Sequence, residues 1–180
     1  MKMAVGDDTV ALRIRRTGPA VKSGKGVKLQ KTITVNRPVA EVFSFLRHLE
    51  NFPKFMRHLE SVHCNGGNIS HWTAQIGGLK LEWDAEAIEL RQNEIISWQS
   101  LPAAAVDNAG SIWFHPDADN RGTVMKVALK YAAPAGKAGA KVAKALGAEA
   151  KSAIEEDLDR FKSLMETGEI PKTNGQPRGP

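Results

Sequence analysis

The chain has 180 residues, of which 42% are hydrophobic and 25% charged, and this composition is typical of one folded domain. A membrane-spanning helix is excluded because no run of about 18 apolar residues occurs, and the single cysteine excludes an internal disulfide and a Cys-rich zinc site. The net charge of +5 comes from residues 1–31, which hold eight bases and two acids, so a basic nucleic-acid-binding face on the remaining residues is excluded.

Residues 1–28 are predicted to be a disordered basic leader, because they are rich in Gly, Lys and Arg and show no sustained hydrophobic period. Asp7 and Asp8 interrupt the place where a secretory signal needs its apolar core. Together with the absence of disulfides, this predicts a cytoplasmic protein. A cationic segment attracts anionic lipid weakly, so contact of the leader with a membrane surface is a second expectation.

A β-strand and two short helices are predicted to follow the leader. Alternating apolar residues indicate a strand over residues 29–36. Pro38 suits the first turn of a helix, and apolar residues at helical spacing extend this helix to about Leu49. The sequence Asn-Phe-Pro at residues 51–53 ends it, and Asn51 is placed to cap a second short helix through residues 55–56.

Six β-strands in a row come next, separated by turn sequences rich in Gly, Asn and Pro. They are predicted at residues 59–64, 69–76, 79–90, 95–101, 111–115 and 123–132. Such short, regularly spaced strands indicate an antiparallel meander. Glu82, Asp84 and Glu86 alternate with apolar residues, so we expect these carboxylates to face solvent.

Pro134 and Gly136 end the sheet region, and a long helix is predicted to follow and to run to about residue 167. Its apolar stripe consists of Ile154, Leu158, Phe161 and Met165. Glu156 and Arg160 are spaced for an ion pair on the solvent-exposed face, where we also place Asp157. The first half is rich in Gly and Ala, which let a helix approach a neighbour closely or leave room beside it. Gly168 is placed to end the helix, so residues 29–168 form the domain and residues 169–180 a flexible tail.

Several short motifs accompany this order of elements. They lie at residues 36–43 (NRPVAEVF), 48–62 (HLENFPKFMRHLESV), 71–72 (HW), 82–85 (EWDA), 98–102 (WQSLP), 108–111 (NAGS), 121–123 (RGT) and 157–162 (DLDRFK). With the element order, these motifs resemble the SRPBCC superfamily of START-domain, polyketide cyclase/dehydrase and birch-allergen-like proteins over about residues 29–171. The resemblance is to an uncharacterised bacterial subgroup of cyclase/dehydrase type. It implies an α+β helix-grip fold, in which a seven-stranded antiparallel curved sheet has two short helices after its first strand and a long C-terminal helix packed across it.

A helix-grip fold implies a cavity between the concave face of the sheet and the last helix. The strand registers and the helix stripe predict a lining of Trp72, Ala74, Trp83, Ala85, Trp98, Ser100, Phe114, Met125, Val127, Leu129, Tyr131, Ile154 and Leu158. Alanines facing a Gly/Ala-rich helix indicate missing volume, which favours a pocket. A core filled by the tryptophans is the alternative.

Catalytic chemistry is only weakly indicated. The histidines lack the spacing of a helical zinc motif and no glycine pattern suits a phosphate, so we expect neither a metal nor a cofactor. Cys64 has no basic neighbour and is interpreted as a small core residue. Ser100 and Tyr131 are expected to present hydroxyls inward, where they orient a ligand or, in an enzyme, Tyr131 acts as a general acid.

Three functions remain open on these grounds. The first is binding or carrying of a hydrophobic small molecule, such as a lipid, a polyketide or an isoprenoid-like compound, in the cavity. The second is an enzyme of cyclase/dehydrase type acting on a polyketide-like substrate. The third is a protein-interaction module with a vestigial pocket. Fold analogy does not choose among them, and neither the ligand nor the oligomeric state is indicated.

Overall fold

The structure is a computed structural model and describes residues 27–102, 104–132 and 136–170. The predictions of a disordered leader and a flexible tail therefore fall outside the described residues, apart from residues 27–28 and 169–170. No helix in these ranges is long and apolar enough to cross a membrane.

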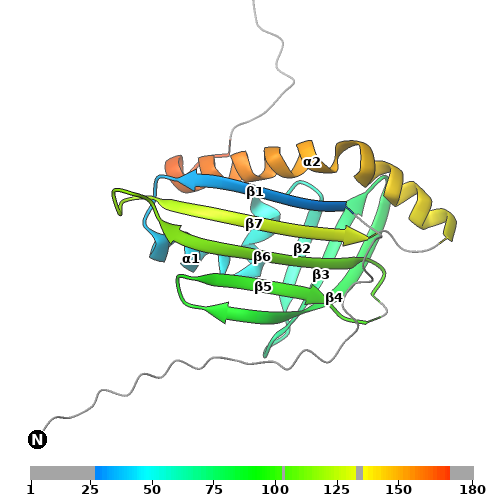
Figure 1. The fold of residues 1–180 in the computed structure, drawn as a ribbon. Helices are drawn as coiled ribbons and strands as arrows, with labels where there is room; N and C mark the ends of the chain where they lie inside the picture. Colours follow the sequence, from blue (N-terminus) through cyan, green and yellow to red (C-terminus); the bar gives the residue numbers. More distant parts are fainter. Residues whose placement is uncertain (1–26, 103, 133–135, 171–180) are drawn as a thin grey trace, which may run out of the picture.

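Seven strands form one antiparallel sheet in the order β1-β7-β6-β5-β4-β3-β2. The strands are β1 (Val27–Val35), β2 (Leu59–Cys64), β3 (Ile69–Ile76), β4 (Leu79–Arg91), β5 (Ile95–Ser100), β6 (Asp107–Pro116) and β7 (Thr123–Ala132). Strands β2 to β7 form the predicted meander, and β1 joins it by pairing with β7. Figure 1 shows that the sheet curls, so that β2 and β3 lie behind β6 and β7.

The helices are α1 (Val39–Leu46), the short 3-10 helix η1 (Leu49–Lys54) and α2 (Gly136–Thr167). The predicted cap of the second short helix is wrong, because η1 begins two residues before Asn51. The Asn51 side chain instead donates from Nδ2 to the Phe45 carbonyl at 2.8 Å, which ties η1 to the preceding helix. The helix-grip arrangement as a whole is confirmed.

Helix α2 contacts β1 and β3, which lie near opposite ends of the sheet, and so closes the concave face (Figure 1). Arg37 holds its C-terminal end, since Nε and Nη2 donate to the carbonyls of Met165 and Glu166, each at 2.9 Å. These carbonyls have no partner within the helix, so this cap satisfies them. Gly168 ends the helix as predicted, with a φ of 76°.

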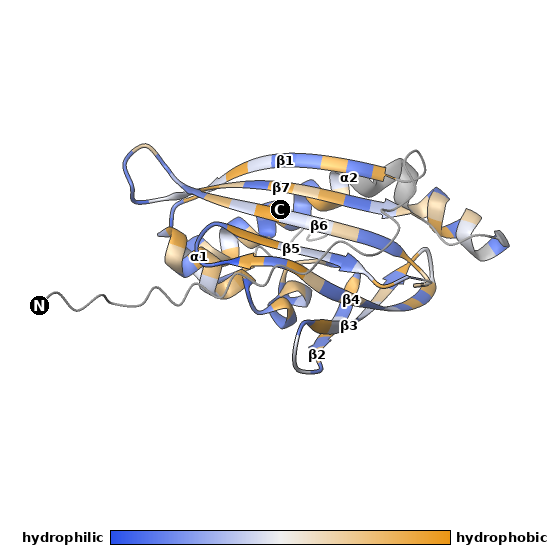
Figure 2. Cartoon of the chain, turned by 60° about the horizontal axis from the view of Figure 1, so that its bottom comes forward, coloured by the Kyte–Doolittle hydropathy of each residue, from blue (hydrophilic) through white to orange (hydrophobic). Residues whose placement is uncertain are grey.

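Hydrophobic and hydrophilic residues alternate along the strands, as the colours of Figure 2 show, and in β6 every second residue from Asn108 to Phe114 is buried. The Gly/Ala-rich first half of α2 lies close to the β3–β4 turn, where a Cβ on Gly77 would be 3.1 Å from the Cβ of Ala145. Small residues here let the helix approach the sheet. The predicted stripe in the second half is confirmed, because all four of its residues are buried.

Gly110 allows close packing between neighbouring strands. The sequence predicts that this strand starts at residue 111, but β6 starts at Asp107, and Gly110 pairs with Trp98 of β5. A Cβ on Gly110 would lie 2.2 Å from the Trp98 ring. We expect Gly110→Ala to lower the free energy of unfolding by about 1–3 kcal/mol through overpacking, measured by urea denaturation. The same change in a Trp98→Phe background should cost less, and an equal cost would contradict this explanation.

Candidate functional site

A cavity of about 560 Å³ lies between the sheet and α2. Residues of η1, of strands β2 to β7 and of α2 line it, and most of them are apolar or aromatic. The polar or ionisable side chains of the lining are His58, Asn108, Tyr131, Lys141, Lys144 and Asp157. Small-molecule sites usually measure roughly 300–1,000 Å³ and have such an apolar lining with few polar groups. This face of the sheet therefore borders an open cavity and not a filled core.

Three tryptophans form a stacked aromatic wall of the cavity. The Trp72 ring lies 5.9 Å from that of Trp83 and 5.8 Å from that of Trp98, with interplanar angles of 20° and 21°. Strand pairing brings Trp72 opposite Trp83. Phe52 of η1 meets Trp72 and Trp98 edge-on, with centroids 5.8 and 5.5 Å away. Aromatic pairs in these geometries stabilise a structure beyond their buried area, so the four rings stabilise this wall of the cavity.

The indole nitrogens of these tryptophans differ in their hydrogen bonding. Trp72 Nε1 donates to Ser70 Oγ, and Trp98 Nε1 donates to Asn108 Oδ1, each at 2.8 Å. Trp83 is 5% exposed, and its Nε1 is buried without a hydrogen-bond partner among the described residues. Buried N–H groups are nearly always paired, so this donor is an exception.

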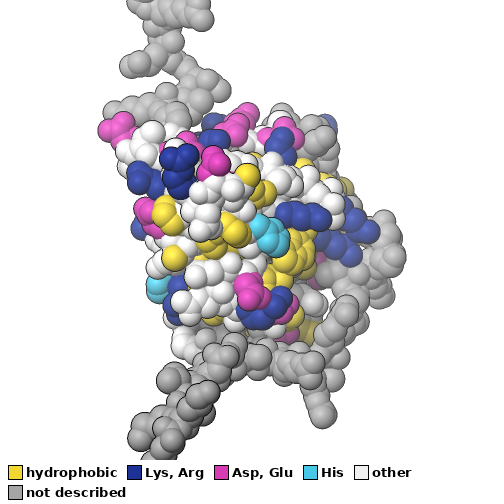
Figure 3. Space-filling model, turned by 60° about the vertical axis from the view of Figure 1, so that its left-hand side comes forward, with side chains coloured by type: hydrophobic (Ala, Val, Ile, Leu, Met, Phe, Trp, Pro, Cys, Tyr) yellow, Lys and Arg dark blue, Asp and Glu magenta, His cyan; other side chains and the backbone are white. Residues whose placement is uncertain are grey.

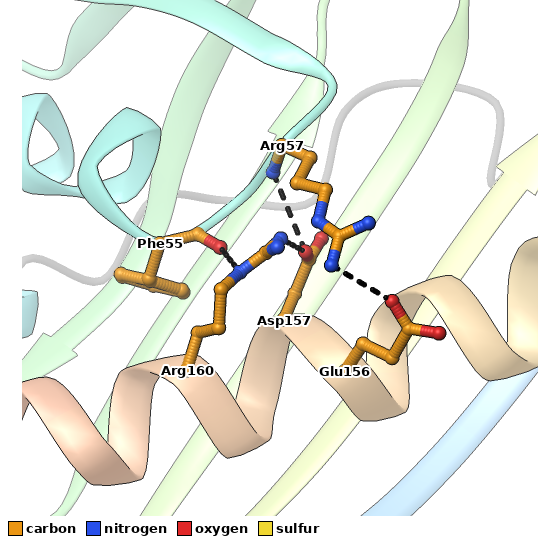
Figure 4. Close-up of polar contacts among 5 residues, drawn as sticks. All are labelled: Phe55, Arg57, Glu156, Asp157 and Arg160. Atoms are coloured by element: carbon orange, nitrogen blue, oxygen red, sulfur yellow. Dashed lines mark hydrogen bonds and ion pairs between the residues drawn. The ribbon is translucent and has the colours of Figure 1, made fainter. Parts of the chain in front are cut away.

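Asp157 belongs to a buried polar cluster on the cavity side of α2 (Figure 4). Its carboxylate pairs with the Arg160 guanidinium, and the two side chains are 6% and 10% exposed. The Arg57 backbone N–H donates to Asp157 Oδ1 at 3.3 Å, and Arg160 Nε donates to the Phe55 carbonyl at 3.0 Å. The cluster therefore fastens α2 to the segment between η1 and β2.

Burial raises the pKa of the Asp157 carboxyl to about 7, while the backbone N–H and the charge of Arg57 oppose this rise. The prediction that Asp157 faces solvent is wrong. It lies three residues after Ile154 and four before Phe161, so helical spacing puts it on the apolar stripe. The predicted Glu156–Arg160 pair is also wrong, because Glu156 pairs with Arg57 at 3.1 Å.

Tyr131 and Asn108 add hydroxyl and amide groups to the cavity wall. Burial raises the pKa of the Tyr131 hydroxyl above its usual range, the nearby charge of Asp157 raises it further, and a hydrogen bond with Asn108 opposes the rise. Asn108 is 2% exposed and also accepts the Trp98 indole N–H. Asn108 was not predicted as a site residue, because the sequence pattern places residue 108 in a loop before the strand.

The polar side chains His58, Lys141 and Lys144 are exposed members of the lining, so they mark where the cavity meets solvent. In the space-filling view of one face, hydrophobic side chains reach the surface beside Lys, Arg and His side chains (Figure 3). A ligand that enters such a cavity passes polar groups before it meets the apolar interior.

The predicted cavity residues fall into two groups. Those in the lining are Trp72, Ala74, Trp83, Trp98, Met125, Val127, Leu129, Tyr131, Ile154 and Leu158. The prediction is wrong for Ala85, Ser100 and Phe114, which are buried outside this lining. Phe114 packs edge-on against Phe43 at 5.5 Å, and Ser100 Oγ accepts the Asn108 backbone N–H at 3.0 Å. Ala85 lies opposite Ser100 on the neighbouring strand.

Nucleophilic and metal chemistry find little support among the described residues. Cys64 is exposed, contrary to its interpretation as a core residue. Partial burial and a hydrogen bond to Glu50 raise the pKa of its thiol to about 11, so it holds its proton at neutral pH. His71 Nδ1 lies 2.8 Å from Asp84 Oδ1 on the exposed face of the sheet. No three His, Cys, Asp or Glu residues in the described ranges are grouped to hold a metal ion.

Comparison with known proteins identifies the family. The model of the polyketide cyclase/dehydrase and lipid transport family matches residues 35–159. An uncharacterised 17.2 kDa protein of Streptomyces lincolnensis is 30% identical over 139 residues, which make up 77% of this chain and 89% of that protein.

Solved structures share the fold. A protein from Deinococcus radiodurans has a TM-score of 0.65 at 27% identity, covering 79% of this chain and 99% of its own. The Zhui aromatase/cyclase of a Streptomyces species has a TM-score of 0.59 at 13% identity, covering 79% of this chain and 98% of its own, and shows likeness of fold alone. The chain belongs to the polyketide cyclase/dehydrase and lipid transport family, within the SRPBCC superfamily.

Proposed function

We propose that this protein binds or carries a hydrophobic small molecule, such as a lipid, a polyketide or an isoprenoid-like compound, in the cavity between the sheet and α2. The observation that carries the proposal is the 560 Å³ cavity with its mainly apolar and aromatic lining. Transfer of apolar surface from water into such a site is favourable by about 25 cal/mol per Å². The cavity is already present in the structure without a ligand, and such a preformed site reduces the entropic cost of binding.

An enzyme of cyclase/dehydrase type is the second candidate, favoured by two groups in the cavity wall. The Asp157 carboxyl, whose pKa burial raises to about 7, suits proton transfer near neutral pH. The Tyr131 hydroxyl is the second group, and because its pKa is raised it stays protonated and can donate a hydrogen bond to a substrate oxygen. We rank this candidate lower, because Asp157 is engaged with Arg160 and with the Arg57 N–H in a contact that fastens α2.

A cytoplasmic location of the protein and contact of its basic leader with a membrane surface stay predictions from the sequence.

Native mass spectrometry of the protein purified from its own cells tests the proposal. We expect a retained apolar molecule that leaves on mild activation, because the lining offers apolar surface and few ionic contacts. Recovery of the protein without any apolar ligand, and failure to take one up from a lipid extract, would argue for an interaction module. An enzyme would lose turnover of that molecule in Tyr131→Phe while still binding it.

A further inference from the structure

We infer that the ligand of this cavity is an amphiphile with an anionic group, which Lys141 and Lys144 of α2 hold at the mouth of the cavity while the apolar chain lies inside. The mouth is the place where the exposed lining residues His58, Lys141 and Lys144 meet solvent. This inference rests on the proposed function, because it assigns a charge and an orientation to the molecule bound at the same site. It separates anionic amphiphiles from cationic ones with the same chain.

The basic residues of the mouth come together from two parts of the fold. Lys141 and Lys144 are three residues apart, so they share one face of α2. This turn of α2 lies against the β3–β4 turn, since a Cβ on Gly77 would be 3.5 Å from the Lys141 carbonyl oxygen. The His58 carbonyl oxygen accepts the backbone N–H of Gln75 at 2.8 Å, two residues before Gly77. His58 and the two lysines therefore lie around the same opening.

The charges at the mouth are unbalanced. No ion pair joins Lys141 or Lys144 to another of the described residues. The acid of the described lining is Asp157, whose side chain is 6% exposed and is paired with Arg160. An anionic group thus meets two cations at the mouth, whereas a cationic group meets no free carboxylate among the described lining residues. Cations at an opening also raise the local concentration of anions and speed their association.

The orientation of the ligand follows from the cost of burying a charge. Because Lys141 and Lys144 are exposed, an anion beside them keeps part of its hydration, and its desolvation cost is small. Inside the cavity the same anion would lie among apolar and aromatic side chains, with the Asp157 carboxylate as a like charge in the wall. The apolar chain has the opposite preference, since its burial is favourable. The stable arrangement therefore has the anionic group at the mouth and the chain inside.

Three probes with the same decyl chain isolate the charge. Decane-1-sulfonate is anionic, decyltrimethylammonium is cationic, and decan-1-ol is the neutral reference for the chain. Calorimetric titration of the full-length protein, below the concentrations at which the probes form micelles, gives the dissociation constants. We expect the sulfonate to bind about 2- to 10-fold more tightly than the ammonium, the range expected for exposed ion pairs. Salt at about 0.5 M should remove most of this difference, since it screens exposed charges.

Charge reversal at the mouth tests the two lysines. When Lys141→Glu is combined with Lys144→Glu, the ammonium should bind more tightly than the sulfonate, and the affinity for the alcohol should change less than about 2-fold. The matched control combines Lys28→Glu with Lys126→Glu, at exposed positions of β1 and β7 outside the lining. It changes the net charge equally and keeps the basic leader, so the sulfonate should remain the tighter ligand.

The outcomes separate the two proposals. If the decyl probes bind but the sulfonate is not preferred, or the mouth variant and the control act alike, the inference is overturned and the hydrophobic cavity stands. If none of the decyl probes binds, the proposed function fails and the inference fails with it. If the mouth variant does not fold, the single variants Lys141→Gln and Lys144→Gln replace it. Each should reduce the preference for the sulfonate about 2-fold, and an unchanged preference in both overturns the inference.

Discussion

Replacing Asp157 by Ala is expected to lower the free energy of unfolding by about 3–5 kcal/mol, because the change leaves the buried Arg160 guanidinium without its counter-charge. The variant also loses the carboxylate that accepts the Arg57 backbone N–H. Urea denaturation at about pH 8 measures the effect. At this pH the Asp157 carboxyl of the unchanged protein is ionised, since its pKa is raised to about 7. The matched control is Glu156→Ala, which breaks the exposed pair with Arg57 and should cost less than about 1 kcal/mol.

A double variant shows whether the pair or the carboxylate alone carries the effect. Asp157→Leu combined with Arg160→Leu removes both charges together, and we expect it to be considerably more stable than the sum of the single changes implies. The cluster does not fasten α2 if the losses of unfolding free energy from the two single changes simply add up in the double variant. The same holds if Asp157→Ala lowers the free energy of unfolding no more than Glu156→Ala does.

Local signals explain why the strands were predictable from the sequence. The bounds predicted for β2, β3 and β7 agree with the structure, because alternation of apolar residues and the turns at Gly66-Gly67 and Gly77-Gly78 are short-range features. The start of β6 was missed, since Asn108 and its neighbours lack apolar alternation and become a strand by pairing with β7 and β5. Pairing of that kind is a tertiary effect.

The polar groups of the site were harder to predict than its apolar ones. An acidic residue in a charged run of a helix is usually solvated. Burial of Asp157 is compensated by Arg160 and by the Arg57 backbone N–H, and neither contact can be read from the helix sequence. Likewise, the strand register predicts that Trp83 faces inward, but not whether its indole N–H finds an acceptor. Hydrogen bonding in the cavity depends on side chains from other strands, as the Trp98–Asn108 bond illustrates.

Filling the cavity from α2 should weaken ligand binding without unfolding the protein. Ala153 lies in the lining, and Ala153→Phe places a ring in space that an apolar ligand needs. A ligand then has to displace that ring, which costs free energy as overpacking does. We therefore expect the affinity for an apolar probe, acetylnaphthalene, to fall about 10- to 100-fold. Calorimetric titration measures this affinity. The free energy of unfolding should change by less than about 1 kcal/mol, since the ring enters a hollow instead of packed atoms.

An alanine on the exposed side of the same helix provides the control. Ala143 is exposed and does not belong to the cavity lining, so Ala143→Phe adds the same ring to α2 without entering the cavity. It should change the affinity for the probe less than about 2-fold, whereas a binding free-energy change of about 1.4 kcal/mol corresponds to 10-fold. If both variants bind the probe as the unchanged protein does, the probe occupies another surface, and the space between the sheet and α2 is not the binding site.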